Sequence, residues 1–258
     1  MVRILIVLMI MALVVFPCLS CKSPSENSGI REHFDDGSLD LSQWEVTRDG
    51  EFSEAVVDVV DVDDTAYIDY RLRLRANTLN TSTSYKFLGI RSIEEFGIDP
   101  GKKISFDIDW NNQSNGCYLL ASVYLCPEVS NNPKNGSNWL KFEYVGVPPG
   151  KNVRINIREK VNGLIHELYT DWGPYNEDNR PVGLPLGENK HRVEITLNTA
   201  NLQVFQDGEE LISDLEHSLN FDSGYLYLQL GSGTNYPGRE VYFDNIVVEG
   251  VAIRKQPQ

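Results

Sequence analysis

Cysteine and histidine are scarce in this sequence, with four of each among 258 residues. The histidines show none of the spacings of a zinc site, so we interpret them as scattered surface or strand residues. The sequence also lacks a glycine-rich phosphate loop, a Gly-x-Ser-x-Gly motif and a Cys/His nucleophile pair. These absences argue against a zinc centre, a P-loop and the common nucleophilic hydrolases.

Basic residues are few as well. The chain has 23 Lys and Arg against 37 Asp and Glu, which gives a formal net charge of −14. An acidic protein is repelled by polyanions, so the charge argues against nucleic acid and polyanionic surfaces as partners.

Long helical periods and internal repeats are absent after the first 20 residues. Short runs with alternating apolar and polar residues recur instead, for example at 68–75 and 103–110, which is typical of a sandwich or barrel. Asn162-Gly163 and Asp207-Gly208 each separate two such runs and supply the positive φ angles of tight hairpins. Further runs cover 118–125, 139–145, 153–158, 191–197, 225–230 and 241–248.

The one long apolar run, Ile4–Phe16, follows a single charge at Arg3 and precedes the small residue Ser20, which is the order of an export signal. It is shorter than the roughly 20 residues that span a bilayer. We therefore expect a signal peptide at 1–20, a polar flexible tether at 21–30, one domain at 31–252 and a tail at 253–258.

Ser20-Cys21 resembles the lipobox of bacterial lipoproteins, in which the cysteine is acylated. Cys18 departs from that pattern, because the family usually has Leu there. The resemblance implies lipidation at Cys21 and a membrane-anchored lipoprotein of the bacterial cell envelope, at the outer membrane or cell surface. Plain secretion or a periplasmic location, and a retained membrane anchor, are the alternatives.

Cys117 and Cys126 lie nine residues apart in a strand-like run, which a straight strand would separate by roughly 30 Å. A disulfide joins Cα atoms about 6 Å apart, so it requires the chain to double back. The sequence leaves the redox state of this pair open.

Three segments resemble the concanavalin A-like lectin and glucanase superfamily: Phe34–Asp40 with Trp44, the hairpin Asn201–Leu211, and the ending Val241–Val248. The first is similar to the first strand of many secreted members, the second to the penultimate hairpin of laminin G-like domains, and the third to their closing strand. The resemblance implies an all-β fold, a two-sheet antiparallel jelly-roll β-sandwich, and says little about activity.

Asp107-Ile108-Asp109-Trp110-Asn111-Asn112 has the spacing of the Glu-x-Asp-x-x-Glu motif of laminarinase-like members, whose first Glu is the nucleophile and whose last is the acid/base. Retaining hydrolysis needs two carboxyls about 5 to 5.5 Å apart, and the amide of Asn112 has no proton to donate. The hypothesis is therefore a protein without catalysis here; if it is an enzyme, Asp107, Asp109 and His166 are the candidate residues. A plain strand with solvated acids is the alternative.

In this superfamily the curved outer face of one sheet commonly receives polysaccharide. We expect residues on the same side as Asp107 and Asp109 to contact sugar, because aromatic rings stack on sugars and polar groups bond their hydroxyls. The alternative is that Trp139 and Tyr124 are core aromatics. The predicted ligand-binding residues are Trp110, Tyr118, Tyr124, Trp139, Glu143, Trp172 and Tyr175.

The segment His166–Tyr175 is predicted to be a loop with two carboxylates, a histidine and three aromatics. His166 beside Glu167 and Tyr169 suits proton abstraction, as in polysaccharide lyases of similar fold. An aromatic rim or simple packing are the alternatives.

No cofactor is expected to be required. Jelly rolls bring the first and last strands together, so Asp35 or Asp36 could approach Asp244 and bind a structural Ca²⁺. The alternative is that these acids cap turns.

The sequence thus predicts an exported, lipid-anchored β-sandwich that binds polysaccharide or oligosaccharide without catalysis. The alternatives are a divergent glycoside hydrolase or polysaccharide lyase, and a structural or adhesive envelope protein.

Overall fold

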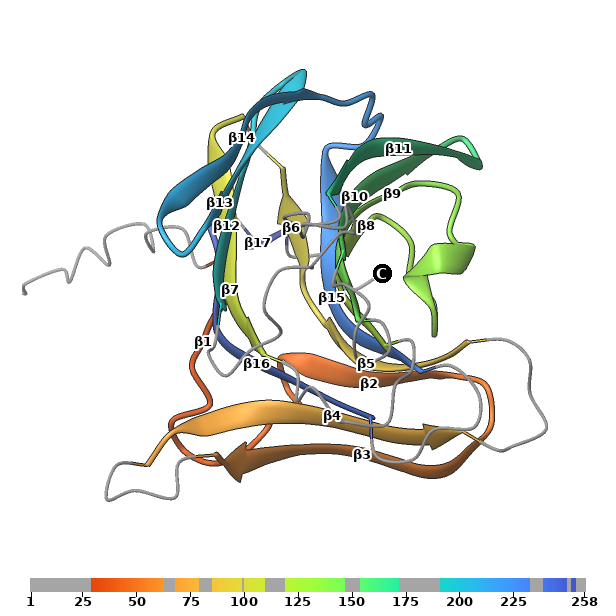
Figure 1. Cartoon of the computed structure of the whole chain (residues 1–258), viewed down its shortest axis with the longest axis vertical. Helices are drawn as coiled ribbons and strands as arrows, with labels where there is room; N and C mark the ends of the chain where they lie inside the picture. Colours follow the sequence, from red (N-terminus) through yellow and green to blue (C-terminus); the bar gives the residue numbers. More distant parts are fainter. Residues whose placement is uncertain are drawn as a thin grey trace, which may run out of the picture.

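The computed structural model describes residues 29–62, 68–78, 85–98, 100–109, 119–146, 154–171, 191–232, 239–249 and 252–253. Most of them lie in β-strands of two antiparallel sheets that pack face to face (Figure 1). Over these ranges, no helix is long and apolar enough to cross a membrane. The expected signal peptide, tether and lipidation site at Cys21 fall outside the described residues.

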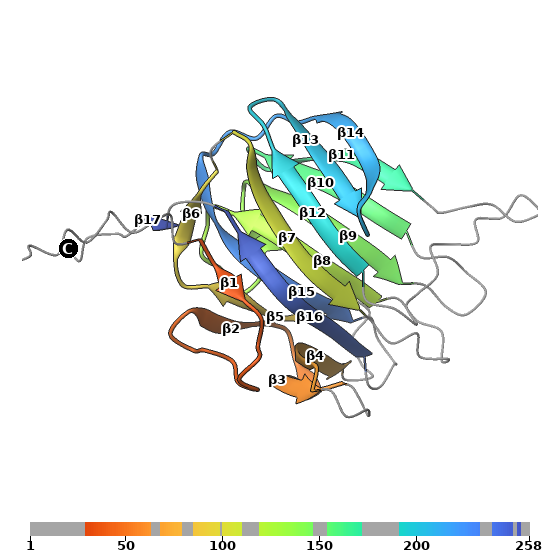
Figure 2. The same ribbon diagram turned by 90° about the vertical axis from the view of Figure 1, so that its left-hand side faces the viewer.

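The eight-stranded sheet has the order β14-β13-β12-β7-β16-β4-β3, and β1 pairs with β16 at one end. Figure 2 shows β12, β7 and β16 side by side on its outer face. Its strands are β1 (Arg31–Glu32), β3 (Phe52–Asp61), β4 (Tyr70–Thr78), β7 (Lys102–Asp109), β12 (His191–Leu197), β13 (Asn201–Gln206), β14 (Glu209–Glu216) and β16 (Arg239–Val248).

The nine-stranded sheet has the order β11-β10-β9-β8-β15-β5-β2, and β6 and β17 extend it beside β15. Its strands are β2 (Trp44–Asp49), β5 (Lys86–Ser92), β6 (Glu95–Gly97), β8 (Leu119–Cys126), β9 (Trp139–Gly146), β10 (Arg154–Val161), β11 (Leu164–Asp171), β15 (Ser223–Ser232) and β17 (Ala252–Ile253). The two sheets form an antiparallel jelly-roll sandwich, as the resemblance implied, and the alternating runs correctly indicated a sandwich or barrel.

Alternate residues of the strands fill the space between the sheets, because successive side chains of a strand point to opposite faces. From β7 these are Ile104, Phe106 and Ile108, and from β9 they include Phe142. The rings of Phe106 and Phe142 meet edge to face across the two sheets, with centroids 5.9 Å apart. One set of alternate side chains on these strands therefore packs in the core, and the other set lies on the outer face of its sheet.

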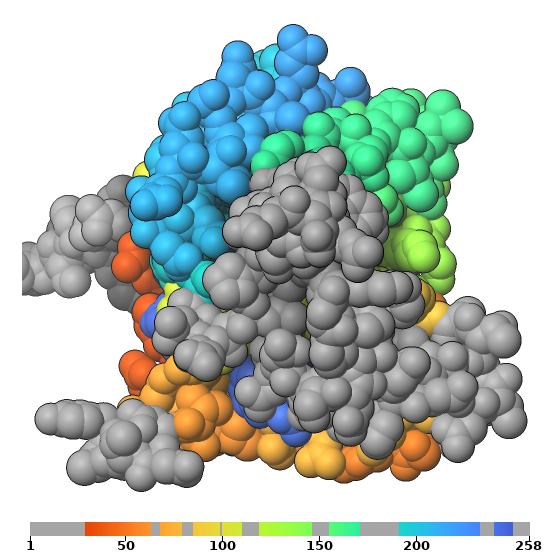
Figure 3. All heavy atoms as spheres, viewed as in Figure 1, coloured from red at the N-terminus to blue at the C-terminus, as the bar shows by residue number. Residues whose placement is uncertain are grey.

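The two hairpin predictions are confirmed. Asn162-Gly163 turns β10 into β11 and Asp207-Gly208 turns β13 into β14, each with positive φ at both residues. The first strand also lies beside the last long strand, since β1 pairs with β16. Figure 3 shows the two hairpins adjoining at one end of the molecule, where β11 contacts β14.

Two expectations for local structure were wrong. The segment from Phe34 to Ser42 forms turns, and the strand begins only at Trp44, because Asp36 and Asp40 accept hydrogen bonds from the backbone two residues on. The segment from His166 to Asp171 belongs to β11 instead of a loop, and a bulge opposite Ile157 and Arg158 disturbs its alternation.

Both sheets curve in the same direction (Figure 1). The outer face of the nine-stranded sheet is concave, and the outer face of the eight-stranded sheet is convex. Residues 127–138, which we call the strap, join β8 to β9 and lie inside the concavity with their single 3₁₀ turn η1 (Pro133–Asn135).

Candidate functional site

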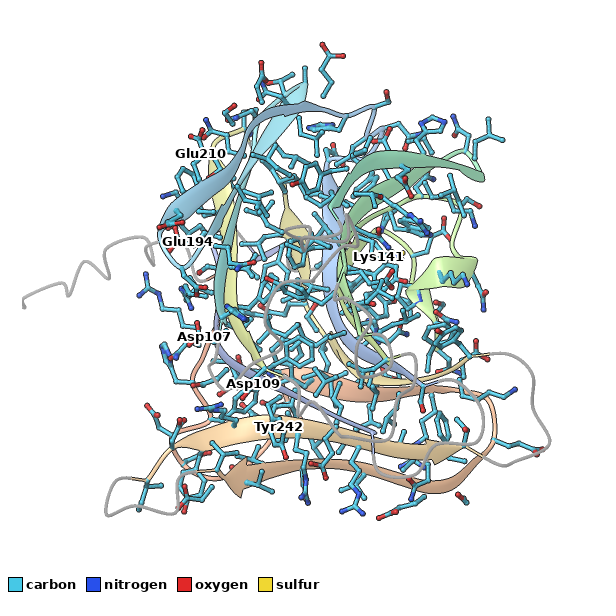
Figure 4. All side chains as sticks on the ribbon, viewed as in Figure 1. Asp107, Asp109, Lys141, Glu194, Glu210 and Tyr242 are labelled. Carbon is cyan, nitrogen blue, oxygen red and sulfur yellow. The ribbon has the colours of Figure 1, made fainter. Side chains whose placement is uncertain are left out.

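Asp107 and Asp109 lie on the convex face, whereas Tyr124, Trp139 and Glu143 lie on the concave face. Asp107 and Asp109 belong to β7 of the eight-stranded sheet and point away from its core residues. Figure 4 shows both aspartates on the opposite side of the molecule from Lys141, which is on β9. The expectation that these side chains share one sugar-binding surface was therefore wrong, because their strands belong to different sheets.

Asp107 is buried in a hydrogen-bonded network on the convex face. Arg192 Nη1 donates to its Oδ1 at 3.0 Å and Asn245 Nδ2 donates to its Oδ2 at 2.8 Å. Arg192 also binds the Ser105 hydroxyl at 2.6 Å and the Asn245 carbonyl at 2.8 Å. Asp107 thus joins three strands of the sheet, and it is neither a solvated acid nor close to the concave face.

Asp109 receives a hydrogen bond of 3.2 Å from Arg71, which also binds Asp69. The charges of Asp69, Asp109 and Asp244 raise the pKa of Arg71 against the opposing effect of burial. These carboxylates therefore have an arginine as counter-ion.

The residues expected to bind calcium do not form a cluster. Asp35 and Asp36 are exposed, and Asp36 caps the turn at Ser38. Asp244 is buried on β16, where it accepts from the backbone and side-chain amides of Asn245. Among the described residues, no group of three or more His, Cys, Asp or Glu is arranged to hold a metal ion.

The concave face carries two rows of side chains that run across seven strands. The strand pairing places the members of each row directly opposite one another. The first row is Glu167, Arg158, Lys141, Tyr124, Tyr227, Arg91 and Glu45. The second row is Thr170, Asn156, Glu143, Ser122, Gln229, Gly89 and Thr47. With about 4.8 Å between strands, each row is roughly 29 Å long.

Glu143 is the centre of a buried network in the second row. Lys141 Nζ donates to its Oε1 at 2.8 Å and the Ser122 hydroxyl to its Oε2 at 2.9 Å. Asn156 Nδ2 lies 3.5 Å from Oε1, and the Thr170 hydroxyl donates to Asn156 Oδ1 at 3.1 Å. The network links four strands, β8 to β11, on the concave side.

The Lys141 ammonium contacts the Glu143 carboxylate and also lies near two aromatic rings. Its ammonium lies 5.7 Å from the ring centroid of Tyr124 and 5.9 Å from that of Trp139. Burial lowers its pKa, the charge of Glu143 opposes this, and the charges of Arg158 and Lys134 lower it further. Three cations therefore lie close enough to influence one another on this half of the face.

The other half of the concave face is covered by the strap. Tyr227 accepts from Ser130 N at 3.0 Å and donates to the Glu128 carbonyl at 2.7 Å. Asn132 Nδ2 donates to Asp49 on β2 at 2.7 Å. The strap thus lies over β15, β5 and β2. On β8 to β11, Ser122, Glu143 and Asn156 are buried as well, and the row members with more exposed side chains are Glu167, Arg158 and Thr170.

Tyr124 and Trp139, predicted to bind ligand, are each only 1 % exposed and pack edge to face with centroids 5.6 Å apart. Together with Cys126, Tyr225 and Tyr227 they form a second apolar cluster beneath the strap. They are therefore packed against protein and support the polar groups above them. Trp110, Tyr118, Trp172 and Tyr175 lie outside the described residues.

His166 lies on the opposite side of its sheet from Lys141. It pairs with Glu159, which pairs with the core residue Leu140. Its Nδ1 is 3.2 Å from Glu159 Oε1, and Glu159 also accepts from Ser218 N at 2.8 Å. This arrangement ties β10 to the segment after β14, and His166 does not reach the two rows.

Cys126 is a free, buried thiol. Burial raises its pKa to about 11, and it lies 3.4 Å from the Asn138 carbonyl. Cys117 lies outside the described residues.

The sequence-based reasoning missed Asn156, Arg158 and Gln229. The signal was present on β10, where Asn156 and Arg158 alternate with Ile155 and Ile157. Gln229 is 1 % exposed, and its Oε1 has no hydrogen-bond partner within the part of the chain that the structure describes.

No protein-family model matches the chain, and no curated protein matches it in sequence. Solved structures do match it in fold. The β-glucanase of Bacillus licheniformis is 13 % identical, with 86 % of this chain and 98 % of that chain covered and a TM-score of 0.55. A GH16 protein for mixed-linkage glucan from Bacteroides ovatus, solved with a G4G4G3G product, is 16 % identical over 85 % and 99 % of the two chains, with a TM-score of 0.55.

A lichenase from a mouse hindgut metagenome is 12 % identical over 87 % of this chain and 100 % of that chain, with a TM-score of 0.53. At these identities the likeness concerns the fold alone. The chain has the concanavalin A-like jelly-roll fold that its three sequence segments resembled.

Proposed function

We propose that the protein binds a glycan on the β8 to β11 half of its concave face and does not cleave it. The observation that carries the proposal is the pair of polar rows, which continue without a break across the strands of that face. Burying the ions Lys141 and Glu143 costs free energy, so a purely structural sheet face gains little from them. The more exposed members of the rows on β10 and β11, Glu167, Arg158 and Thr170, offer the hydroxyls of a sugar polymer hydrogen bonds beside this buried pair.

The fold relatives support a role in glycan recognition, because the three described above carry glucanase names or a glucan product. The proposal that catalysis is absent rests on the carboxylates. Glycoside hydrolysis by the common routes uses two carboxyls, about 5 to 5.5 Å apart in retaining enzymes. Among the described residues paired with or next to Glu143 on this face, Lys141, Val145, Ser122 and Asn156 carry no carboxyl.

Affinity electrophoresis in gels that contain single polysaccharides tests binding. Arg158→Gln removes an exposed member of the first row, and Arg73→Gln is the matched control. Each arginine lies on a strand and donates two hydrogen bonds to one carboxylate, Arg158 to Glu167 and Arg73 to Asp58. Arg73, however, lies on the convex face. We expect retardation that Arg158→Gln weakens and Arg73→Gln preserves; no retardation with any polysaccharide would overturn the proposal.

A reducing-end assay on the retarded polymers distinguishes binding from hydrolysis. We expect no new reducing ends, and no unsaturated product at 235 nm of the kind a lyase forms. Product that disappears with Glu143→Gln, in a variant whose thermal melting shows that it is still folded at the assay temperature, would instead identify a divergent hydrolase on the same face.

We also propose that the protein is exported and anchored through an acylated Cys21. The support is the order of charged, apolar and small residues in 1–21. Detergent phase partitioning of cells that express the protein tests this. The protein is expected in the detergent phase, and Cys21→Ala is expected to move it to the aqueous phase.

A further inference from the structure

We infer that the glycan is acidic, a polymer that carries carboxylate or sulfate groups, and that Lys134 and Lys160 select it. The inference rests on the proposed glycan function and names its ligand class. It starts from the charges on the β8 to β11 half of the concave face and in the adjoining strap, which differ from those of the chain as a whole.

The carboxylates of this region are already engaged. Glu143 holds Lys141 at 2.8 Å, and Glu167 holds Arg158 at 2.6 Å. In the strap, Glu128 accepts the Ser137 amide at 2.8 Å. A ligand that arrives here therefore meets few carboxylates that still lack a partner.

Two lysines of the same region have no acidic partner among the described residues. Lys160 lies opposite Trp139 on the concave side, and its ammonium donates to the Lys134 carbonyl at 3.3 Å. Lys134 is an exposed residue of η1 in the strap, and its ammonium lies 5.7 Å from the centroid of the Phe87 ring on β5. An ammonium has three donors, so each lysine keeps donors for a ligand.

The charges of Lys134 and Arg158 both act on Lys141, and the charge of Lys160 acts on Cys126. Arg158 and Lys160 both lie on β10, and the Lys134 carbonyl in the strap accepts from Lys160 and from the Trp139 indole, which ties Lys134 to the same half of the face. A neutral polymer would leave them without counter-ions, whereas carboxylates or sulfates along a chain would pair with them.

The net charge of −14 opposes such binding at long range. Screening limits this repulsion to about 8 to 10 Å at physiological salt, so adjacent cations decide the contact. Because the whole molecule repels polyanions, any preference for an acidic polymer has to come from a local cluster such as this one. Nonspecific attraction cannot produce it.

The test compares polymers that differ only in charge. Polygalacturonate, alginate, hyaluronan and a sulfated galactan are each paired with their carboxyl-reduced or desulfated form, and binding to the purified protein is measured by affinity electrophoresis and calorimetry. We expect at least one acidic polymer to bind tenfold or more tightly than its neutral form, with affinity falling as salt rises from 50 to 500 mM.

The double variant Lys134→Gln/Lys160→Gln is expected to lose at least tenfold of that affinity. Lys102→Gln/Lys103→Gln on β7 removes the same charge from the other sheet and is expected to lose none. Equal binding of both forms of a polymer, or equal effects of the two double variants, would overturn the inference and leave the proposed function standing. Absence of binding to all polymers, neutral ones included, would overturn both. Unchanged melting temperatures establish that each variant is folded.

Discussion

Lys141 Nζ donates a hydrogen bond of 2.8 Å to Oε1 of Glu143, two residues further along β9 and on the same face. The two side chains are 8 % and 3 % exposed, so both charges have left water. Side chains two residues apart in a strand point to the same face. Lys141 and Glu143 are therefore adjacent wherever this segment forms a strand, whichever sheet the strand joins. The fold contributes the burial, through the strands on either side.

Glu143→Gln is expected to destabilise the protein by about 3 to 5 kcal/mol, because it leaves the Lys141 ammonium buried without its counter-ion. The double variant Lys141→Met/Glu143→Leu removes both charges and is expected to be about 2 kcal/mol more stable than the single variant. Urea unfolding followed by tryptophan fluorescence measures both. A single variant within about 1 kcal/mol of the wild type would show that the pair is not buried in solution.

Asp107→Asn is expected to destabilise the protein by about 2 kcal/mol, since Arg192 loses a charged hydrogen bond on the convex face. Glycan binding is expected to remain unchanged, because the concave face belongs to the other sheet. Glu194→Gln is the control: Glu194 lies 3.9 Å from Arg192 Nε and its side chain is 42 % exposed, so its loss is expected to cost less than about 0.5 kcal/mol. Weaker glycan binding by a folded Asp107→Asn protein would contradict the placement.

The strands and the hairpins could be predicted because their signals are local. Alternation in 103–109 and 139–145 places residues on two sides of a strand, and Asn162-Gly163 fixes a turn by its φ angles. These signals come from neighbours in sequence and need no tertiary information.

The site could not be predicted because it depends on which sheet each strand joins. The strands β7 and β9 both alternate charged and apolar residues over part of their length, and nothing local assigns Asp107 to one outer face and Glu143 to the other. Arg158 joins Lys141 only through the register of β10 on β9. The spacing match of Asp107 and Asp109 to a glucanase motif was therefore misleading.

Tyr227→Phe is expected to loosen the strap, since the hydroxyl bridges Ser130 N and the Glu128 carbonyl. Two partly buried backbone groups then lose a partner, at a cost of about 1 kcal/mol. Hydrogen exchange of the Ser130 amide is expected to accelerate at least tenfold. Tyr242→Phe, whose hydroxyl binds Glu240 on the convex face, is expected to leave this exchange rate unchanged; equal rates in both variants would contradict the role of Tyr227.

The Cys126 thiol is expected to resist modification in the folded protein. Burial raises its pKa from 9.0 to about 11, so the reactive thiolate is rare at pH 8, and the side chain is also inaccessible. With the other three cysteines replaced by serine, we expect labelling by a disulfide reagent to be at least 100-fold slower in the folded than in the urea-unfolded protein.

The same shift predicts how stability depends on pH. The folded state holds the thiol proton more tightly than the unfolded state. The protonated Cys126 thiol therefore contributes fully to the free energy of unfolding below pH 9, and this contribution is lost as pH rises through about 11. Urea midpoints between pH 8 and 11 should therefore fall more steeply in this single-cysteine protein than in its Cys126→Ala derivative. Parallel curves, or rapid labelling in the native state, would show that Cys126 is solvated, and the aromatic cluster beneath the strap would then be open to water.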